Sequence, residues 1–145
     1  MTDGRRFRVL GVVDDCTREC LALVPDTSLS GVRVARELDA IIAVRGRPTA
    51  IVSDNGTEFT SNAIRAWADD RGVAWEYIQP GKPQQNAYVE RYNRTVRYDW
   101  LSQYLFESIE QVQQSATEWL WFYNHERPNM ALGGITPMQR LAAAA

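Results

Sequence analysis

Two acidic residues, Asp54 and Glu90, have side chains and sequence neighbours that suit them to act together in one chemical site. Asp54 closes a short apolar run, and Glu90 is followed at helical spacing by Asn93, Arg94 and Arg97. A carboxylate beside cationic and amide side chains suits a site that holds metal ions and a phosphate backbone together, because hard oxygen ligands select Mg²⁺ or Mn²⁺. Two such ions about 4 Å apart can activate a nucleophile and stabilise the leaving oxygen of a phosphodiester.

Each acid also has a purely structural interpretation. Residues 54–56, Asp-Asn-Gly, form a strong turn signal whatever their function. A glutamate on an amphipathic helix is most often a solvated charge, although Glu90 lies one position from Val89, at the edge of a predicted buried stripe. The residue types alone leave both interpretations open.

The cysteines and the histidine do not predict a metal centre. Cys16 and Cys20 are the two cysteines, and His125, the one histidine, lies far along the chain from them. A structural zinc site needs four ligands in paired spacings. We therefore expect two reduced cysteines, and a histidine at the surface or at the end of a helix.

Hydrophobic periodicity predicts the elements that would position these groups. Strands over residues 7–14 and 20–25 flank a turn and predict an antiparallel hairpin. A helix that begins at Ser30 and ends at Gly46 leads to a short strand, residues 50–53, which we expect to pair in parallel. Asp54 would then lie at the carboxyl end of a parallel strand, where ligands of α/β sheets bind.

The remaining predicted elements follow the same logic. They are a helix from Ser61 to Gly72, a strand over residues 73–78, a helix from Gln84 with Val89, Tyr92, Val96 and Trp100 buried, and a helix that begins at Ser108 with a capping box to Gln111 and ends at Pro128. The alanines after Leu141 are expected to fray.

Composition and charge limit the class of protein. The 145 residues are 45% apolar and 23% charged with a net charge of −2, which indicates one folded domain and argues against coating of nucleic acid by bulk charge. Residues 82–97 nevertheless hold four basic residues against one acidic residue, so we expect a polyanion contact there. No apolar run approaches the about 20 residues of a membrane span, which together with the lack of a signal-peptide pattern predicts a cytoplasmic protein with no membrane partner.

Several linked motifs run through the chain. Residues 52–59 read Val-Ser-Asp-Asn-Gly-Thr-Glu-Phe, residues 79–87 read Gln-Pro-Gly-Lys-Pro-Gln-Gln-Asn-Ala, and residues 90–94 read Glu-Arg-Tyr-Asn-Arg. The tail adds Tyr123, Asn124, Arg127, Pro128, Leu132, Gly133, Gly134, Thr136 and Pro137. Together these motifs resemble the integrase core of bacterial insertion-sequence transposases, relatives of the retroviral integrases. The 35 residues between Asp54 and Glu90 equal the spacing of that family's second acidic pair.

The resemblance implies an α/β, ribonuclease-H-like fold, in which helices flank a mixed sheet. It also implies that residues 1–145 form an integrase catalytic core whose C-terminal part, from about residue 108, is a helical tail. It implies metal-dependent polynucleotidyl transfer that joins transposon ends to target DNA, with two Mg²⁺ or Mn²⁺ ions held by Asp54 and Glu90. The implied partners are DNA and further copies of the chain in a homo-oligomer. Five residues would line the DNA path: Lys82, Asn86, Asn93, Arg94 and Arg97.

The chain departs from the family pattern at its start. The family's active site needs a third acid, on a strand that precedes the segment matching Asp3 to Phe7, and Asp3, Asp14 and Asp15 match loop or turn positions where we expect no metal. We therefore expect the first, central strand of the sheet to be missing and the chain to be inactive. Such a fragment could arise from a truncated gene copy, a start-site error or a cloned piece. The alternative is a non-catalytic module that binds DNA or an intact transposase. A nuclease of the ribonuclease-H type would share the metal chemistry but does not account for the tail pattern.

Overall fold

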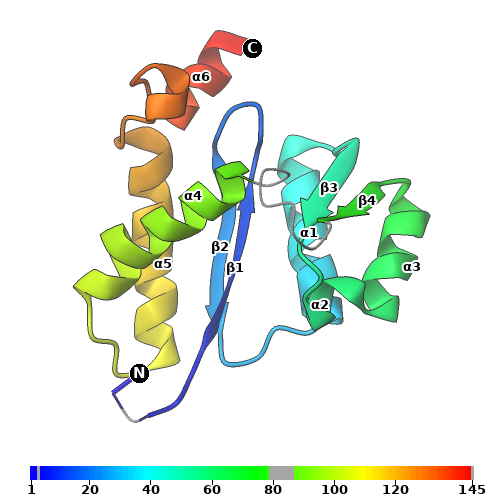
Figure 1. Cartoon of the computed structure of the whole chain (residues 1–145), viewed down its shortest axis with the longest axis horizontal. Helices are drawn as coiled ribbons and strands as arrows, with labels where there is room; N and C mark the ends of the chain where they lie inside the picture. Colours follow the sequence, from blue (N-terminus) through cyan, green and yellow to red (C-terminus); the bar gives the residue numbers. More distant parts are fainter. Residues whose placement is uncertain (3, 79–86, 145) are drawn as a thin grey trace. The chain divides into compact units, whose positions relative to one another are not determined.

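The computed structural model describes residues 1–2, 4–78 and 87–144. The chain divides into two compact units, one formed by Met1–Ser28 with Arg91–Ala145 and the other by Leu29–Glu90. Each unit has its own strands and helices (Figure 1). None of the helices in the described part of the chain is long and apolar enough to cross a lipid bilayer.

The first unit contains the predicted hairpin. Strand β1 (Arg8–Val13) pairs in antiparallel register with β2 (Cys20–Asp26), and a bulge interrupts the ladder between Val12 and Val13. The connecting turn is held by Asp14, whose carboxylate accepts the backbone N–H groups of Cys16 and Thr17 at 2.8 and 3.0 Å. The hairpin prediction is therefore confirmed, and Asp14 has a turn role of the kind expected for it.

Helices α4 (Ala87–Thr95) and α5 (Ile109–His125) lie beside this hairpin (Figure 1). The predicted stripe of α5 is buried against β2 at Val112, Ala116, Trp119 and Tyr123. Its N-terminus is capped as predicted, because the Ser108 hydroxyl accepts the Gln111 N–H at 3.3 Å. The Glu107 N–H donates to the side-chain oxygen of Gln111 at 2.9 Å.

Helix α4 continues into a π-helical turn (Val96–Trp100) and a 3₁₀ turn (Leu101–Gln103), which the periodicity did not predict. Helix α6 (Pro137–Ala144) follows α5 and extends through the alanines that were expected to fray. Thr136 begins α6 with a capping box of its own, since its hydroxyl accepts the Gln139 N–H at 3.2 Å and its N–H donates to the Gln139 side chain at 2.8 Å. This second capping box explains why the short helix forms.

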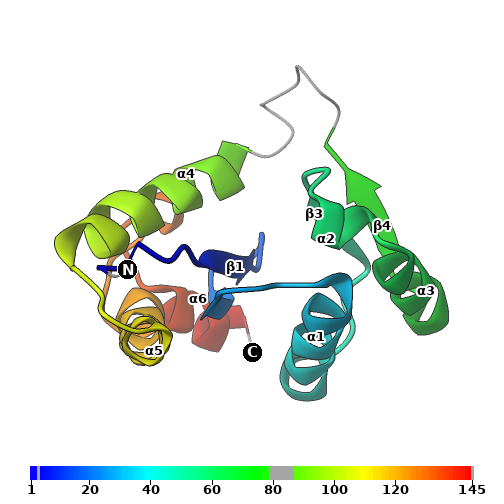
Figure 2. The same cartoon turned by 90° about the horizontal axis from the view of Figure 1, so that it is seen from below.

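The second unit contains α1 (Gly31–Arg45), β3 (Ala50–Ser53), α2 (Thr57–Thr60), α3 (Asn62–Arg71) and β4 (Ala74–Tyr77). Ser30 and Ser61 cap α1 and α3 as predicted, and the short helix α2 was not predicted. Strands β3 and β4 pair in parallel, as expected, with Ser53 opposite Tyr77. Helices α1 and α3 lie side by side (Figure 2).

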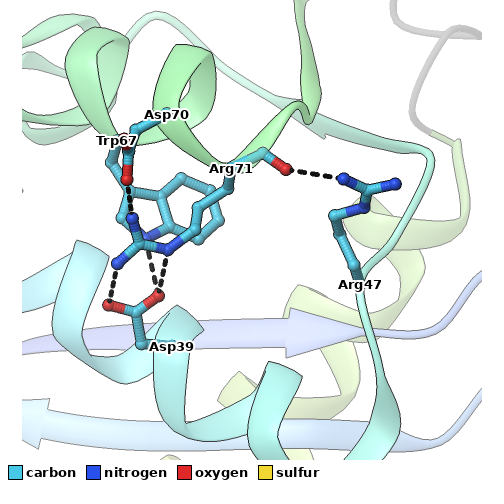
Figure 3. A network of polar contacts seen from close by, with 5 residues as sticks. All are labelled: Asp39, Arg47, Trp67, Asp70 and Arg71. Atoms are coloured by element: carbon cyan, nitrogen blue, oxygen red, sulfur yellow. Dashed lines mark hydrogen bonds and ion pairs between the residues drawn. The ribbon is translucent and has the colours of Figure 1, made fainter.

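A polar network ties α1 to α3 and aligns the two segments that enter the parallel strands (Figure 3). The Asp39 carboxylate accepts hydrogen bonds from the Trp67 indole at 2.9 Å and from Arg71 Nε at 3.1 Å. Arg47, before β3, donates to the carbonyl of Arg71, before β4, at 3.1 Å, and Arg71 also pairs with Asp70. The hydrogen bonds from Trp67 and Arg71 lower the pKa of Asp39, because they favour its charged form.

In the described part of the chain the strands form two separate sheets, which agrees with the predicted mixed sheet without its central strand. The hairpin and the β3–β4 pair are each two-stranded, so in the described part of the chain each sheet keeps two edges without a strand partner. Both predicted pairings are present, antiparallel and parallel. The sequence periodicity identified each pairing because neighbouring strands are linked by a turn or by one helix, whereas it contained no local signal for how the two pairs join.

Candidate functional site

Asp54 is the first residue after β3, and its side chain is exposed. One carboxylate oxygen, Oδ1, accepts the N–H of Gly56 at 2.8 Å. The predicted turn role is thus present, and it uses only part of the hydrogen-bonding capacity of an ionised carboxylate, which has about four lone-pair positions. The turn therefore fixes the carboxylate and leaves room for a further ligand.

Hydrogen bonds to β4 hold the loop that carries Asp54. Buried Ser53 accepts the Trp75 indole N–H at 2.8 Å and donates to the carbonyl of Asp54 at 2.8 Å. The side-chain amide of Asn55 donates to the carbonyl of Ile78 at 3.0 Å. The residues before and after Asp54 are therefore both hydrogen-bonded to β4 or to the residue that follows it, and these bonds set the position of Asp54.

The carboxylates of Asp54 and Glu58 both lie close to Gly56, so a larger residue there would require one of these side chains to shift. A Cβ atom at this position would lie 3.0 Å from Asp54 Oδ1 and 3.0 Å from Glu58 Oε1, tighter than ordinary van der Waals contact. Glu58 belongs to the motif of residues 52–59, but the sequence did not predict a role for it at the site. Its spacing of four from Asp54 is the signal that could have drawn attention to it.

Glu90 lies in the first turn of α4, and its side chain is exposed. Of the predicted stripe, Tyr92 of this helix and Val96 and Trp100 of the turn that follows it are buried as predicted, whereas Val89 is half-buried. Because residues three and four apart share a helix face, Glu90, Asn93 and Arg94 lie together on the side away from Tyr92. Glu90 is thus on the exposed face and not at the edge of a buried stripe.

The same helix presents an uncompensated positive charge. Arg91, Arg94 and Arg97 are all exposed, and no ion pair joins their side chains to any residue that the structure describes. Arg94 and Arg97 were predicted, whereas Arg91 was omitted although it is spaced three residues from Arg94. Guanidinium groups that lack acidic partners are suited to phosphate contacts.

Buried contacts with the hairpin fix the rotation of α4. The Tyr92 hydroxyl lies 2.8 Å from the Cys20 thiol, and a Cβ atom at Gly11 would lie only 3.0 Å from the Tyr92 ring. The ring also meets Tyr123 of α5 edge-on, with centroids 5.5 Å apart. Burial raises the pKa of the Cys20 thiol to about 12, so the thiol stays protonated at neutral pH.

Asn124, one of the tail motif residues, has a structural role. Its side-chain amide donates to the Cys20 carbonyl and accepts the Cys20 N–H, both at 2.8 Å, and the residue is 3% exposed. Asn124 therefore satisfies both backbone groups of a β2 residue in the way that a neighbouring strand would.

The other predictions are resolved to different extents. Both cysteines are free, and exposed His125 stacks on Trp121 with centroids 4.5 Å apart, which confirms the structural interpretation of these residues. Lys82, Asn86 and the loop of residues 80–83 lie outside the described residues. Among the described residues no group of three or more metal-binding side chains occurs. The meeting of Asp54 and Glu90 at one ion stays a prediction.

Comparison with known proteins adds independent evidence. Two family models, both described as an integrase core domain, match residues 1–83 and 71–137. A 31.7 kDa protein of insertion element IS407 from Burkholderia multivorans is 40% identical over 139 residues, which is 96% of this chain and 50% of that protein. A 39.2 kDa protein of insertion element IS476 from Xanthomonas euvesicatoria is 40% identical over 96% of this chain and 40% of its own length.

A solved structure shows the same fold. A chain of the simian T-cell lymphotropic virus intasome matches with a TM-score of 0.73 and 21% identity, over 92% of this chain and 47% of that chain. The ribonuclease-H-like fold expected from the sequence is thereby confirmed. The chain spans about half the length or less of the relatives it matches. It belongs to the integrase core domain family.

Proposed function

We propose that this chain forms part of a DNA transposition enzyme that joins transposon ends to target DNA by metal-dependent polynucleotidyl transfer. One observation carries the proposal: in an integrase core, the exposed carboxylate of Asp54 stands at the carboxyl end of a parallel strand and is held by the strand pair itself. That position is where α/β sheets bind ligands.

Asp54 and Glu90 are the groups that would hold the metal. Both side chains are exposed carboxylates, and neither forms an ion pair with a described residue, so hard oxygen donors are available for Mg²⁺ or Mn²⁺. When bound, two ions would supply Lewis acidity to the attacking and leaving oxygens of the phosphodiester. The chain's own contribution is to hold Asp54 in a rigid turn and Glu90 on a helix anchored by Tyr92.

The basic face of α4 is the part of this proposal that binds DNA. Asn93, Arg94 and Arg97 would contact phosphates, and Lys82 and Asn86 would extend the same path. Contacts of this kind position a duplex without reading its sequence. The partners proposed are therefore transposon-end DNA, target DNA and further copies of the chain.

Conservative substitution of the two acids tests the assignment. We expect Asp54→Asn and Glu90→Gln each to lower strand transfer by the complete gene product in Mg²⁺ by more than about 100-fold, since even outer-shell partners of metal ligands are worth about 10- to 100-fold. The readout is joining of labelled element-end oligonucleotides to a plasmid.

Two exposed acids serve as matched controls for this experiment. Glu110→Gln changes a glutamate in the first turn of α5, and Asp69→Asn changes an exposed aspartate of α3. Both variants should transfer strands like the parent. Full activity of either Asp54→Asn or Glu90→Gln would remove that residue from the metal site.

A second candidate function is a non-catalytic module that binds DNA or an intact transposase. It is favoured by the exposed arginines of α4, which need no metal to attract phosphate. DNA binding that persists in EDTA, with no strand transfer in Mg²⁺ and no effect of Asp54→Asn, would favour this alternative over the enzyme.

A further inference from the structure

The π-helical turn Val96–Trp100 continues the buried face of α4 as far as Trp100. The N–H of Leu101 donates to the carbonyls of Val96 and Arg97, which closes the wider turn. Tyr92, Val96 and Trp100 are spaced four residues apart, so they share one face of the helix and its continuation. All three are buried, and Trp100 donates to Ser115 at 2.8 Å and stacks on Trp119.

Tyr98 lies midway between the buried residues Val96 and Trp100 and therefore faces outward. Its side chain is 58% exposed, and no ring contact or side-chain hydrogen bond joins it to another described residue. Its backbone, in contrast, is held firmly, because its carbonyl accepts Ser102 Oγ at 2.8 Å and Gln103 Nε2 at 3.1 Å. An aromatic ring is therefore presented to solvent from a rigid backbone.

The surroundings of this ring are cationic. Arg94 precedes Tyr98 by four residues and Arg91 by seven, so the three lie along one side of the helix. The nearest acid, Asp99, is already paired with Arg127 at 3.2 Å. Arg91, Arg94 and Arg97 outnumber the one acid of residues 82–97, Glu90, and none of them forms an ion pair with a described residue. The charge beside Tyr98 is therefore net positive, which favours a polyanionic ligand.

We propose that Tyr98 is a stacking platform for an unpaired nucleotide of a DNA strand whose phosphates are held by Arg91 and Arg94. The proposal rests on the proposed function, because it takes DNA as the ligand of this chain. It adds Tyr98 as a contact residue and an unpaired nucleotide as the part of the DNA that is bound, neither of which the motifs assign. A tyrosine ring can stack only on a base that has left the duplex stack, and such stacking tolerates any sequence. The arginines supply the charge-dependent part of binding, and the ring supplies the part that is independent of salt.

DNA binding in EDTA tests the proposal apart from catalysis. Fluorescence anisotropy with the whole chain compares a blunt duplex with the same duplex carrying a single-stranded extension that contains 2-aminopurine. We expect Tyr98→Leu to weaken binding of the extended DNA by about 5- to 100-fold, while Tyr98→Phe stays within about twofold, because base–aromatic stacking needs the ring and not the hydroxyl. Quenching of 2-aminopurine should survive in Tyr98→Phe and disappear in Tyr98→Leu.

Two controls identify the contribution of stacking. The salt dependence of binding distinguishes stacking from charge, and a second exposed tyrosine distinguishes stacking at Tyr98 from apolar contact at any exposed ring. Arg94→Gln should reduce the slope of log K against log salt by about 0.7, and Tyr98→Leu should leave that slope unchanged. Tyr104 is similarly exposed, at 56%, and lies beyond the 3₁₀ turn, so Tyr104→Leu should bind both DNAs like the parent. Circular dichroism and thermal unfolding confirm that each variant is folded.

Three results would overturn the inference. Parental binding of the extended DNA by Tyr98→Leu would exclude stacking, as would an equal loss on the blunt duplex or an equal effect of Tyr104→Leu. These results would leave the proposed function intact. If the parent chain bound neither DNA, both this inference and the DNA-binding part of the proposed function would fail.

Discussion

At the scale of single residues, the tail motif has a direct structural explanation in Asn124. Its amide satisfies the N–H and the carbonyl of Cys20, and both residues are buried. A buried backbone group left without a partner costs about 1 to 3 kcal/mol. Because Asn124→Ala leaves two such groups without their partner, we expect it to lower the free energy of unfolding, measured by urea denaturation, by at least about 1 kcal/mol.

The control for this prediction lies on the same helix. Gln114 carries an exposed amide on α5, and Gln114→Ala should change the free energy of unfolding by no more than about 0.5 kcal/mol. Equal stabilities of the two variants would show that the bonds between Asn124 and β2 contribute nothing net.

At the scale of elements, the junction of α1 and α3 depends on a charged group whose pKa is lowered. Asp39 binds protons less readily in the folded state than in the unfolded state, so its stabilising contribution is present above its ordinary pKa of about 3.9 and is lost as the pH falls through the lowered value. Asp39→Asn keeps an acceptor for Trp67 and removes the charge facing Arg71. The Asp39 side chain is 42% exposed, so we expect a loss of at most about 1 kcal/mol at pH 7.

The pH dependence identifies the cause of that loss. The difference in the free energy of unfolding between the parent and Asp39→Asn should shrink toward zero as the pH is lowered below about 4, where the parent's carboxyl also becomes neutral. Asp69→Asn, an exposed change on α3, should show no such trend. A difference that stays constant from pH 7 to pH 3 would mean that packing, and not charge, accounts for it.

At the scale of the whole molecule, the proposed function requires one ion to engage residues far apart in the chain. If Asp54 and Glu90 share a divalent ion, Mn²⁺ at ten times its dissociation constant should stabilise the parent by about 1.4 kcal/mol. Asp54→Asn and Glu90→Gln should each abolish this gain, and Glu110→Gln should keep it. Independent, half-sized effects of the two variants would show that the acids do not share an ion.

Local signals in the sequence were sufficient for most elements. The caps at Ser30, Ser61 and Ser108 lie where they were predicted, because capping is a contact between residues three apart. The antiparallel hairpin and the parallel strand after α1 followed from alternation and connection length for the same reason. Helix α6 also has a local signal, the capping box at Thr136, but it was not predicted, and neither was the short helix α2.

The features missed depend on contacts between distant residues. The π-helical turn was not predicted, although the burial of Trp100, which stacks on Trp119, was. The exposure of Glu90, Arg91 and Tyr98 follows from the rotation of α4 on the hairpin, which is set by Tyr92 meeting Cys20 across 72 positions of the chain.

The candidate site shows the same division. The identity of Asp54 and Glu90, their separation along the chain and the family could be inferred from the order of residues, since motifs and caps are local or depend on spacing. The hydrogen bonds from β4 that hold the Asp54 loop, and the exposed aromatic ring among arginines, could be identified only from the folded chain. Packing and long-range hydrogen bonds select which face of each helix is buried. The hydrophobic pattern of a single helix is often compatible with more than one buried face, so the sequence of that helix alone does not decide it.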